Sequence, residues 1–242
     1  MIRFFVSEED LCLEEMVLDK ENAAHAKVLR LKTGDEVVAC DGAGREAVCS
    51  VTLTDGVYCL SRGDIVLSET EAAAKVSIYM ALPKADKLEH VIQKATELGA
   101  FEIVTFPSAR CVSRPDEKSL KKKLERWQKI AASAAEQSGR GRIPEVIVLG
   151  DYTSALKRAA EADLSIVFYE NEKSNTLHKT LEAAAASTIS LLTGPEGGLE
   201  AREIEEAIAS GFQICTLGKR ILRCETAPLC ALSAVMYHEG EF

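Results

Sequence analysis

The sequence predicts an α/β protein in which a mostly parallel sheet follows a small β domain. From residue 76 onward, apolar runs of strand length alternate with amphipathic stretches of helix length, and this alternation is typical of repeated βαβ units. Residues 1–73 differ, because they hold strand-like runs around a hairpin signal and carry fifteen acidic against seven basic side chains. A chain of 242 residues can form one large domain or two small ones. We expect two, over residues 1–73 and 74–242, linked through ETEAAAK at 69–75.

Two strands and one helix can be placed within residues 1–73. The runs EVVAC at 36–40 and EAVCSVTL at 46–53 are strand-like, and Asp41-Gly42-Ala43-Gly44 between them is a hairpin turn signal. Residues 22–31 follow the pattern of a short helix, with Asn22 at its N-terminal cap. These elements predict the small β domain.

The second part is predicted from its alternating pattern and its helix signals. Asp86 precedes an apolar stripe at helical spacing, and Gly99 ends it, which marks one helix clearly. The predicted strands cover residues 76–82, 101–106, 145–149, 164–169, 187–193 and 212–217. The predicted helices cover residues 86–98, 116–138, 153–161, 175–186 and about 226–238, with a further helix from near Leu199.

Two loops that each begin with a glycine follow the last two predicted strands. The first is Gly194-Pro195-Glu196-Gly197-Gly198, and the second runs from Gly218 to Arg223. Ligands of α/β proteins bind at the carboxyl ends of parallel strands, and glycine lets the backbone approach a ligand closely. Neither loop has the phosphate-binding G-x-x-x-x-G-K-[ST] or the dinucleotide G-x-G-x-x-G pattern. The glycines alone allow two interpretations, either two ligand-binding loops or two tight turns with a purely structural role.

The charge distribution bears on a nucleic-acid partner. The net charge of −9 counts against one. Residues 110–142, however, carry ten basic and four acidic side chains, and a local basic region can still contact phosphate. Lys121, Lys122, Lys123 and Lys129 share one face of the helix predicted at 116–138. A solvated helix face is the alternative interpretation for these lysines.

The cysteines and the N-terminus indicate a cytoplasmic protein without a metal. None of the eight cysteines forms a C-x-x-C pair, so a zinc site is not expected. The N-terminus lacks the pattern of a signal peptide, and no apolar run approaches the roughly 20 residues of a membrane span. We therefore expect reduced, mostly buried thiols.

The two loops sit in motifs that resemble a known family. LLTGPEGGLEAREIEEA and LGKRILRCETAP, in this order, resemble the SPOUT superfamily of RNA methyltransferases. More closely, they are similar to the bacterial family that methylates N3 of a uracil, conventionally numbered 1498, in 16S ribosomal RNA. EQSGRGRIP at 136–144 matches the family's E-Q-x-G-R…P segment. One departure is Cys224, where relatives commonly have threonine, which puts a side-chain contact there in doubt.

The resemblance implies a fold and partners. It implies a C-terminal SPOUT domain with a mostly parallel sheet and a deep trefoil knot, preceded by a PUA-like β-barrel that helps to hold RNA. It also implies S-adenosylmethionine as cofactor, 16S rRNA within the 30S subunit as substrate, and a homodimer. The acidic balance of residues 1–73 leaves a purely structural barrel equally open. The residues that match the family's pattern in the barrel are His25, Val28, Leu29, Arg30, Gly34, Asp41, Gly42 and Gly44.

The resemblance also implies site residues. Arg140 and Arg223 are candidates to stabilise a uracil anion, with Glu136 or Glu225 as its base. Glu196 could complement the cofactor's sulfonium or ribose, or cap the helix from Leu199. The cofactor-binding candidates are Leu192, Thr193, Gly194, Pro195, Glu196, Gly197, Gly198, Leu217, Gly218, Ile221 and Leu222. The RNA-binding candidates are Arg30, Arg110, Arg114, Lys121, Lys122, Gln137 and Arg140.

Two other functions remain open from the sequence. A non-catalytic RNA- or ribosome-binding protein could keep the same fold, and an enzyme with another nucleotide cofactor could use an ordinary doubly wound sheet. A methyl-transfer assay on 30S particles separates the first of these from the methyltransferase. Calorimetry with S-adenosylmethionine and NAD separates the second.

Overall fold

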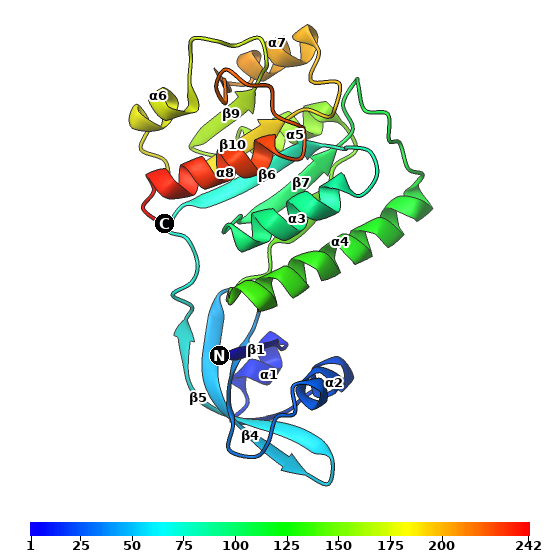
Figure 1. The fold of residues 1–242 in the computed structure, drawn as a ribbon, viewed down its shortest axis with the longest axis vertical. Helices are drawn as coiled ribbons and strands as arrows, with labels where there is room; N and C mark the ends of the chain where they lie inside the picture. Colours follow the sequence, from blue (N-terminus) through cyan, green and yellow to red (C-terminus); the bar gives the residue numbers. More distant parts are fainter. The chain divides into compact units, whose positions relative to one another are not determined.

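The computed structural model describes residues 1–242, which form two compact units (Figure 1). The first unit comprises Met1–Glu71 and Ala135–Ile143, and the second comprises Ala72–Ala134 and Pro144–Phe242. No helix in the structure combines the length and the apolar character needed to cross a bilayer.

The first unit is built on a five-stranded mixed sheet in the order β1-β3-β4-β5-β2. β1 pairs with β3 in parallel, and the other pairs are antiparallel. The predicted hairpin is β3–β4, and it continues into a long β5 that pairs along β4. Its elements are β1 (Ile2–Phe5), α1 (Glu8–Cys12), β2 (Glu15–Val17), α2 (Lys20–Val28), β3 (Glu36–Cys40), β4 (Arg45–Thr54) and β5 (Val57–Leu67).

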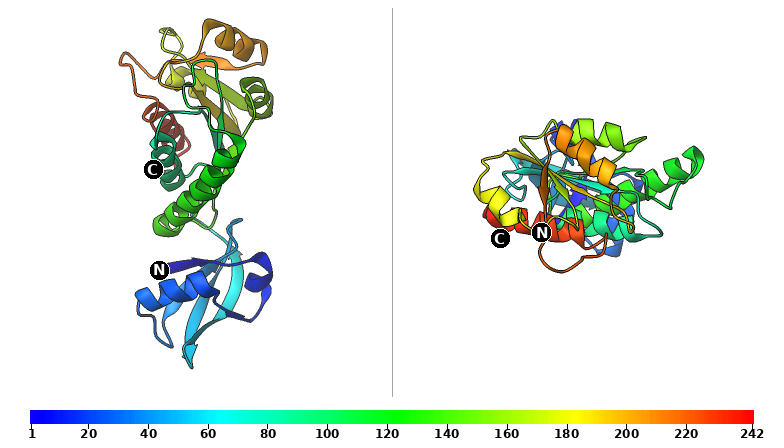
Figure 2. Two further views of the ribbon diagram at one scale, coloured as in Figure 1. Left: turned by 90° about the vertical axis from the view of Figure 1, so that its right-hand side faces the viewer. Right: turned by 90° about the horizontal axis from the view of Figure 1, so that it is seen from above.

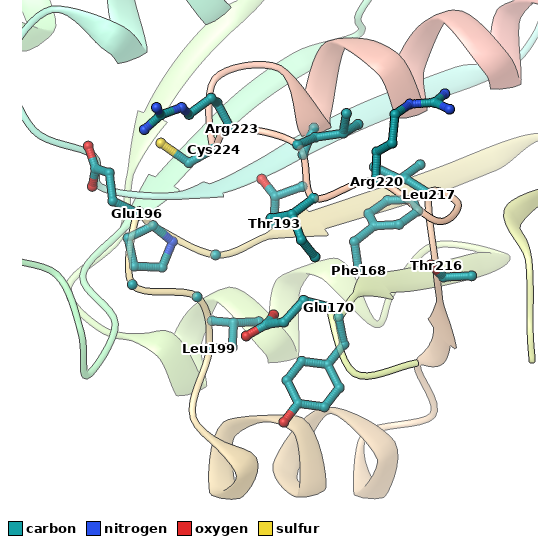
Figure 3. Close-up of a pocket in the computed structure, with 18 of the residues that line it drawn as sticks. Phe168, Glu170, Thr193, Glu196, Leu199, Thr216, Leu217, Arg220, Arg223 and Cys224 are labelled. Atoms are coloured by element: carbon teal, nitrogen blue, oxygen red, sulfur yellow. The ribbon is translucent and has the colours of Figure 1, made fainter. Parts of the chain in front are cut away.

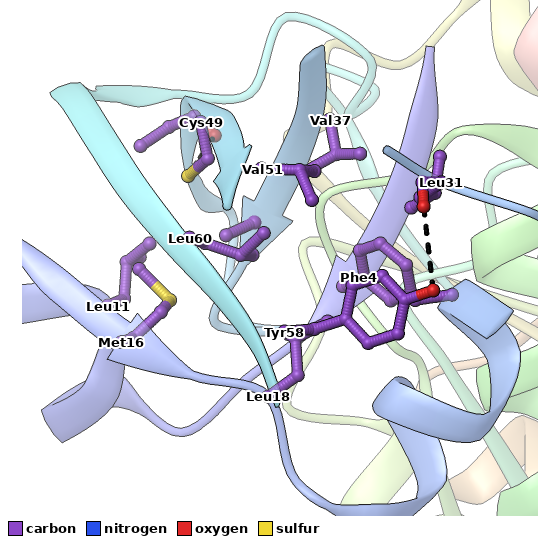
Figure 4. Close-up of a cluster of buried hydrophobic side chains, with 13 residues drawn as sticks. Phe4, Leu11, Met16, Leu18, Leu31, Val37, Cys49, Val51, Tyr58 and Leu60 are labelled. Atoms are coloured by element: carbon purple, nitrogen blue, oxygen red, sulfur yellow. Dashed lines mark hydrogen bonds between the residues drawn. The ribbon is translucent and has the colours of Figure 1, made fainter. Parts of the chain in front are cut away.

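One hydrophobic cluster fills this unit (Figure 4). β4 alternates between buried and more exposed residues, so that Ala47, Cys49 and Val51 face the cluster, as expected for a half-buried strand. Phe4 and Leu60 are completely buried in it. The unit therefore has a core of its own.

The cap of α2 differs from the prediction. α2 begins at Lys20, and Asp19 caps it by accepting the backbone N–H of Asn22 at 2.8 Å. The Asn22 side chain instead donates to the carbonyl of Phe5 at 2.9 Å. Aspartate and asparagine are equally good caps, so the sequence alone did not separate the two positions.

The segment at 135–143 is tied to the first unit by Glu71. The Glu71 carboxylate accepts the Arg140 guanidinium at 2.6 Å and the N–H groups of Gly141 and Arg142 at 3.0 and 3.1 Å. Ile143 N–H also donates to the carbonyl of Gly42 at 3.0 Å. The family-like E-Q-x-G-R segment thus has structural contacts of its own.

The second unit is an α/β layer structure around a six-stranded sheet in the order β11-β9-β10-β6-β7-β8. Every strand pair is parallel, which confirms the predicted parallel sheet. The strands are β6 (Lys75–Ala81), β7 (Glu102–Phe106), β8 (Glu145–Val148), β9 (Leu164–Phe168), β10 (Thr188–Thr193) and β11 (Gln213–Cys215). The knot that the resemblance implies stays a prediction.

Helices cover both faces of this sheet, with α3 and α8 on one face and α5 and α7 on the other (Figure 2). β7 and β9 are buried along their whole length, as strands between two helical layers must be. The helices are α3 (Lys87–Glu97), α4 (Glu117–Ser138, whose last four residues belong to the first unit), α5 (Tyr152–Ala159), α6 (Leu177–Glu182), α7 (Ala201–Ala209) and α8 (Ala227–His238).

Two helix starts in this unit differ from the predictions. Asp86 stands at the N-cap of α3, but its side chain makes no capping hydrogen bond. α6 begins two residues later than predicted, because Thr176 caps it and the Asn175 side chain donates to the carbonyl of Ile214 at 2.8 Å, and it ends at Glu182 instead of residue 186. Asn175 therefore holds the neighbouring strand instead of extending the helix.

Candidate functional site

A pocket of about 470 Å³ lies at the carboxyl ends of three neighbouring strands, β9, β10 and β11 (Figure 3). Both glycine loops predicted from the sequence border it. Of the predicted cofactor residues, all line the pocket except Leu192, which is fully buried within β10. The structure thus brings together two segments that the sequence could only place one βα unit apart.

The first loop is tightly folded, and two of its glycines are required by their surroundings. Gly198 has φ +69° and donates its N–H to the carbonyl of Pro195 at 2.9 Å. A Cβ on Gly194 would lie 3.0 Å from the carbonyl carbon of Gly198. Gly197 differs, because its added Cβ would meet the Arg110 side chain at 3.2 Å, and Arg110 donates to the Gly197 carbonyl at 2.9 Å. Arg110 therefore supports this loop from outside.

The helix after the first loop is capped by its own residues and not by Glu196. α7 begins at Ala201, and Glu200 and Glu203 form a reciprocal capping box there. Glu203 is buried and also accepts the N–H of Ala109 at 2.9 Å. Capping by Glu196, one of the two roles left open from the sequence, is therefore wrong.

Glu196 belongs instead to an ionic cluster that joins both loops. Lys87, at the start of α3, lies 3.2 Å from Glu196 on the first loop and 3.1 Å from Glu225 beyond the second. Lys87 also donates to the sulfur of Cys224 at 3.6 Å, and Glu196 accepts the backbone N–H of Lys84 at 3.0 Å. One ammonium group thus bridges the two sides of the pocket.

The cluster fixes the protonation states of its members. The hydrogen bond to Glu225 raises the pKa of Lys87, so its amine stays charged. A hydrogen bond from its own backbone N–H, with those from Cys224 and Lys87, lowers the pKa of Glu225 to about 2. Burial, reinforced by Glu225, raises the pKa of Cys224 to about 11. Its thiol is therefore protonated at neutral pH and donates to Glu225 at 3.2 Å.

The second loop presents backbone and apolar side chains to the pocket. Gly218 has φ +108°, and nothing lies within 4 Å of the Cβ it lacks. Its N–H donates to the Thr216 hydroxyl at 3.2 Å. Leu217 and Leu222 are partly buried, whereas Ile221 is 78% exposed. These side chains form an open apolar wall.

Several lining residues were not predicted from the sequence. Phe168 ends β9, and Tyr169 and Glu170 follow it. Thr216 follows β11, Arg220 belongs to the second loop, and Lys87 comes from α3. The signal for the first three was present, because β9 was predicted as a strand and its end must lie at the same sheet edge. The position of β9 between β11 and β10 in the sheet was not deducible from the sequence.

The catalytic candidates are found in different units. Arg223 is exposed and lines the pocket. Arg140 belongs to the first unit, is 4% exposed and pairs with Glu71. Glu136 also belongs to the first unit and lies 2.8 Å from Nδ1 of His25. Neither Arg140 nor Glu136 lines the pocket.

Most of the RNA-binding candidates are exposed. Arg30, Arg114, Lys121, Lys122 and Gln137 have exposed side chains. Arg110 is exposed too, but it holds the first loop as described above. The neighbouring Lys123 lies 5.9 Å from the centre of the Trp127 ring, so it has an intramolecular partner that Lys121 and Lys122 lack.

Comparison with known proteins shows which family this chain belongs to. Residues 70–236 match an RNA methyltransferase domain, and residues 18–56 match an RNA methyltransferase PUA domain. Ribosomal RNA small subunit methyltransferase E of Bacillus subtilis is 38% identical over 98% of this chain and 96% of its own length. The chain belongs to the ribosomal RNA small subunit methyltransferase E family. Its first unit is PUA-like, and its parallel sheet is typical of SPOUT methyltransferases.

Relatives of this family have been solved with cofactor. Ribosomal RNA small subunit methyltransferase E of Neisseria gonorrhoeae, bound to S-adenosylmethionine, has a TM-score of 0.86 at 30% identity, covering 98% of this chain and 97% of its own. A Legionella pneumophila protein in complex with the same cofactor has a TM-score of 0.84 at 26% identity, with the same coverage.

The residues of the pocket fit S-adenosylmethionine. The volume lies in the range of small-molecule sites, which are mostly apolar with a few polar groups. The hydroxyl of Thr193 is buried and has no hydrogen-bond partner in the protein, so a ligand could satisfy it. Gly218 lines the pocket with nothing within 4 Å of its missing Cβ, so its backbone is open to a ligand.

Proposed function

We propose that this protein transfers a methyl group from S-adenosylmethionine to N3 of a uracil in 16S ribosomal RNA, at the position conventionally numbered 1498. The proposal is supported by one observation above all: two glycine loops with the family's motifs meet around a single pocket that fits the cofactor. The choice of uracil and of its N3 atom rests on the resemblance of the two motifs to the family.

The proposed reaction gives separate roles to the cofactor loops, to Arg223 and to the proton acceptor. When bound, the cofactor supplies a methyl group already activated by a positively charged sulfur, so no protein nucleophile is needed. The two loops orient it, and orientation can contribute about 7–11 kcal/mol. Arg223 lines the same pocket, and its proposed role is to stabilise the charge that develops on a uracil anion. Glu225 is a poor base, because its pKa is about 2. Glu136 stays the proposed proton acceptor, and it would have to exchange its His25 contact for the uracil.

The remaining parts of the proposal concern partners. We propose that residues 1–73 form an RNA-binding domain and residues 74–242 the methyltransferase domain, acting as a homodimer in the cytoplasm on 16S rRNA within the 30S subunit. The dimer is supported by α8, whose outer face exposes Cys230, Ala234 and Tyr237. An exposed apolar helix face usually marks a contact surface.

The deciding experiment is a methyl-transfer assay with labelled S-adenosylmethionine on 30S subunits lacking the modification. We expect label in one nucleotide, and a single stop in reverse transcription, because a methyl group on N3 blocks base pairing. Binding of the cofactor and the subunit without transfer would favour the non-catalytic RNA-binding alternative. Binding of NAD in place of S-adenosylmethionine would favour a different nucleotide enzyme.

Lys87 is expected to act as a positioning residue for both loops. Lys87→Met should weaken S-adenosylmethionine binding a few-fold, the scale of losing a partly exposed ion pair. Lys84→Met is the matched control, since only the backbone of Lys84 contacts Glu196. Binding is measured by calorimetry at pH 6 and pH 9.

The pH dependence of this effect follows from the pKa shifts. The pKa of Glu225 is lowered to about 2. The ion pair between Glu225 and Lys87 is therefore fully formed above the ordinary glutamate pKa near 4.5 and is lost only as the pH falls toward 2. The pKa of Lys87 is raised, so its charge persists through pH 9. The ratio of variant to wild-type Kd should be equal at both pH values. Equal affinities of the wild type and Lys87→Met would contradict the positioning role.

Lys121 and Lys122 are expected to contact RNA phosphates. Changing both to alanine should reduce the slope of log Kd against log salt by about 0.7–0.9 for each phosphate that the variant no longer neutralises. Lys123→Ala is the comparison, because Lys123 lies over Trp127 and should change the slope less. The measurement is 16S rRNA binding over a series of salt concentrations. An unchanged slope in the double variant would leave these lysines as a solvated helix face.

A further inference from the structure

Glu170 is a pocket carboxylate that none of the roles assigned above uses. It follows β9 by two residues and lines the pocket between the two glycine loops (Figure 3). Its carboxylate packs against the first loop, because a Cβ on Gly198 would lie 2.8 Å from one carboxylate oxygen and 3.3 Å from the other. Only the missing side chain of Gly198 leaves room for this arrangement.

The Glu170 carboxylate has no partner in the protein, unlike the other acids around the pocket. Glu196 accepts the N–H of Lys84 and pairs with Lys87, and Glu225 pairs with the same lysine. No hydrogen bond or ion pair in the structure involves the Glu170 side chain. It is therefore the one lining carboxylate that is free to bind a ligand.

The loop that carries Glu170 is held in place by its neighbour Glu172. The Glu172 carboxylate accepts the N–H groups of Lys173, Ser174 and Asn175 at 2.9, 2.6 and 2.9 Å, and also the Ser174 hydroxyl at 2.7 Å. The hydrogen bond from Ser174, followed by those from the backbone, lowers the pKa of Glu172 to about 2. Glu170 is thus presented from a fixed turn, as a binding residue requires.

We infer that Glu170 accepts hydrogen bonds from the 2′- and 3′-hydroxyls of the cofactor's ribose. This inference rests on the proposed function. Two oxygens of one carboxylate match two neighbouring hydroxyls, and charge-assisted hydrogen bonds of this kind are short and strong. A carboxylate near the end of a parallel strand also contacts the ribose in dinucleotide-binding folds.

The position of Glu170 within the pocket favours the ribose over the other groups of the cofactor. In Figure 3 it lies between the side lined by Leu217 and the side lined by Glu196 and Arg223. The apolar wall suits the adenine ring, and Arg223 marks the side where the uracil reacts. The ribose joins the adenine to the sulfonium, whose methyl group faces the uracil, so the ribose occupies the middle. The cationic amino group of the methionine tail is the competing partner, and the test separates the two.

The test is calorimetry with two ligands on the full-length protein. S-adenosylmethionine carries both the ribose and the amino group, whereas 5′-methylthioadenosine carries the ribose alone. Glu170→Gln keeps the shape but removes the charge, and Glu205→Gln, at an exposed position on α7 outside the pocket, is the matched control. We expect Glu170→Gln to weaken both ligands by a similar factor of roughly ten to a hundred, the range for hydrogen bonds to charged groups, and Glu205→Gln to weaken neither.

A third ligand, which lacks the 2′-hydroxyl, tests the ribose contact in the wild-type protein as well. Wild type should bind 2′-deoxy-5′-methylthioadenosine more weakly than the ribose form, and Glu170→Gln should reduce that difference. The inference is overturned if Glu170→Gln weakens S-adenosylmethionine alone, if it weakens neither ligand, or if wild type does not distinguish ribose from deoxyribose. Failure of wild type to bind S-adenosylmethionine at all would count against the proposed function instead.

Discussion

Gly218→Val is expected to reduce S-adenosylmethionine binding by at least a hundredfold while the protein stays folded. Gly218 lines the pocket at φ +108°, a conformation that β-branched residues rarely adopt. No protein atom lies within 4 Å of its missing Cβ, so valine would project into open space beside the ligand. The variant therefore both strains the second loop and fills volume that the cofactor needs.

The chain offers a matched control for the backbone strain. Gly211 has φ +90° and the same open surroundings, but it ends α7 away from the pocket. Gly211→Val should lose a similar amount of stability, at least about 1–2 kcal/mol, and bind the cofactor like wild type. Thermal unfolding and calorimetry on both variants separate strain from blockage. A folded Gly218→Val protein with wild-type affinity would remove the second loop from the site.

Gly197 needs a different interpretation from Gly218, although both stand in predicted ligand loops. A valine at Gly197 would first meet the side chain of Arg110. Its effect on binding would therefore act through Arg110 and the shape of the first loop, and we expect it to be smaller than that of Gly218→Val. The spacing of glycines in the sequence cannot distinguish these two surroundings.

The sequence predicted those parts of the fold that depend on local pattern. β10 and β7 are apolar runs between glycines or polar turns, and their burial in a parallel sheet follows directly. β1 and β2 were not predicted, because four and three residues are too few to show a period. Their pairing is fixed by strands far along the chain, such as β3 and β5. β5 was not predicted either, because Ser61-Arg62-Gly63-Asp64 interrupts its apolar run.

The site was predicted where it is made of continuous motifs and missed where it is made of long-range contacts. The two loops are recognisable as sequences, but Lys87 reaches Glu196 and Glu225 from more than a hundred residues away. Arg140 illustrates a contact that a motif does not report. Its segment matches a family motif, yet its guanidinium is buried against Glu71, and a sequence pattern does not report which acid a distant arginine will meet.

Arg223→Ala is expected to lower the rate of methyl transfer by on the order of a hundred- to a thousandfold, with little change in cofactor affinity. Its side chain makes no ion pair in the structure and lines the pocket beyond the apolar wall. A cation aimed at the uracil ring acts on charge that develops as N3 loses its proton, so the loss appears in turnover. Removing one such donor typically costs about 2.7–4 kcal/mol. Lysine should rescue poorly, because it lacks the planar fork.

Single-turnover rates with saturating cofactor and 30S subunits measure this effect. Arg202→Ala is the control, since Arg202 is an exposed arginine on α7 that pairs only with Glu206. If Arg223→Ala matches wild type in single turnover, Arg223 does not stabilise the reacting uracil, and Arg220 at the same pocket becomes the next candidate for that cation.

Arg140→Ala should also reduce transfer, but with a second consequence that Arg223→Ala lacks. Because Arg140 is buried against Glu71, its loss leaves a carboxylate of the first unit without its guanidinium and should lower the melting temperature. Glu71→Gln tests which role dominates, since it weakens the same contact and leaves the arginine in place. If Arg140 only supports the fold, both variants lose stability and activity in proportion. If Arg140 reaches a uracil bound by the other protomer, Arg140→Ala loses far more activity than Glu71→Gln, and mixing Arg140→Ala with Arg223→Ala protein restores one working site per heterodimer.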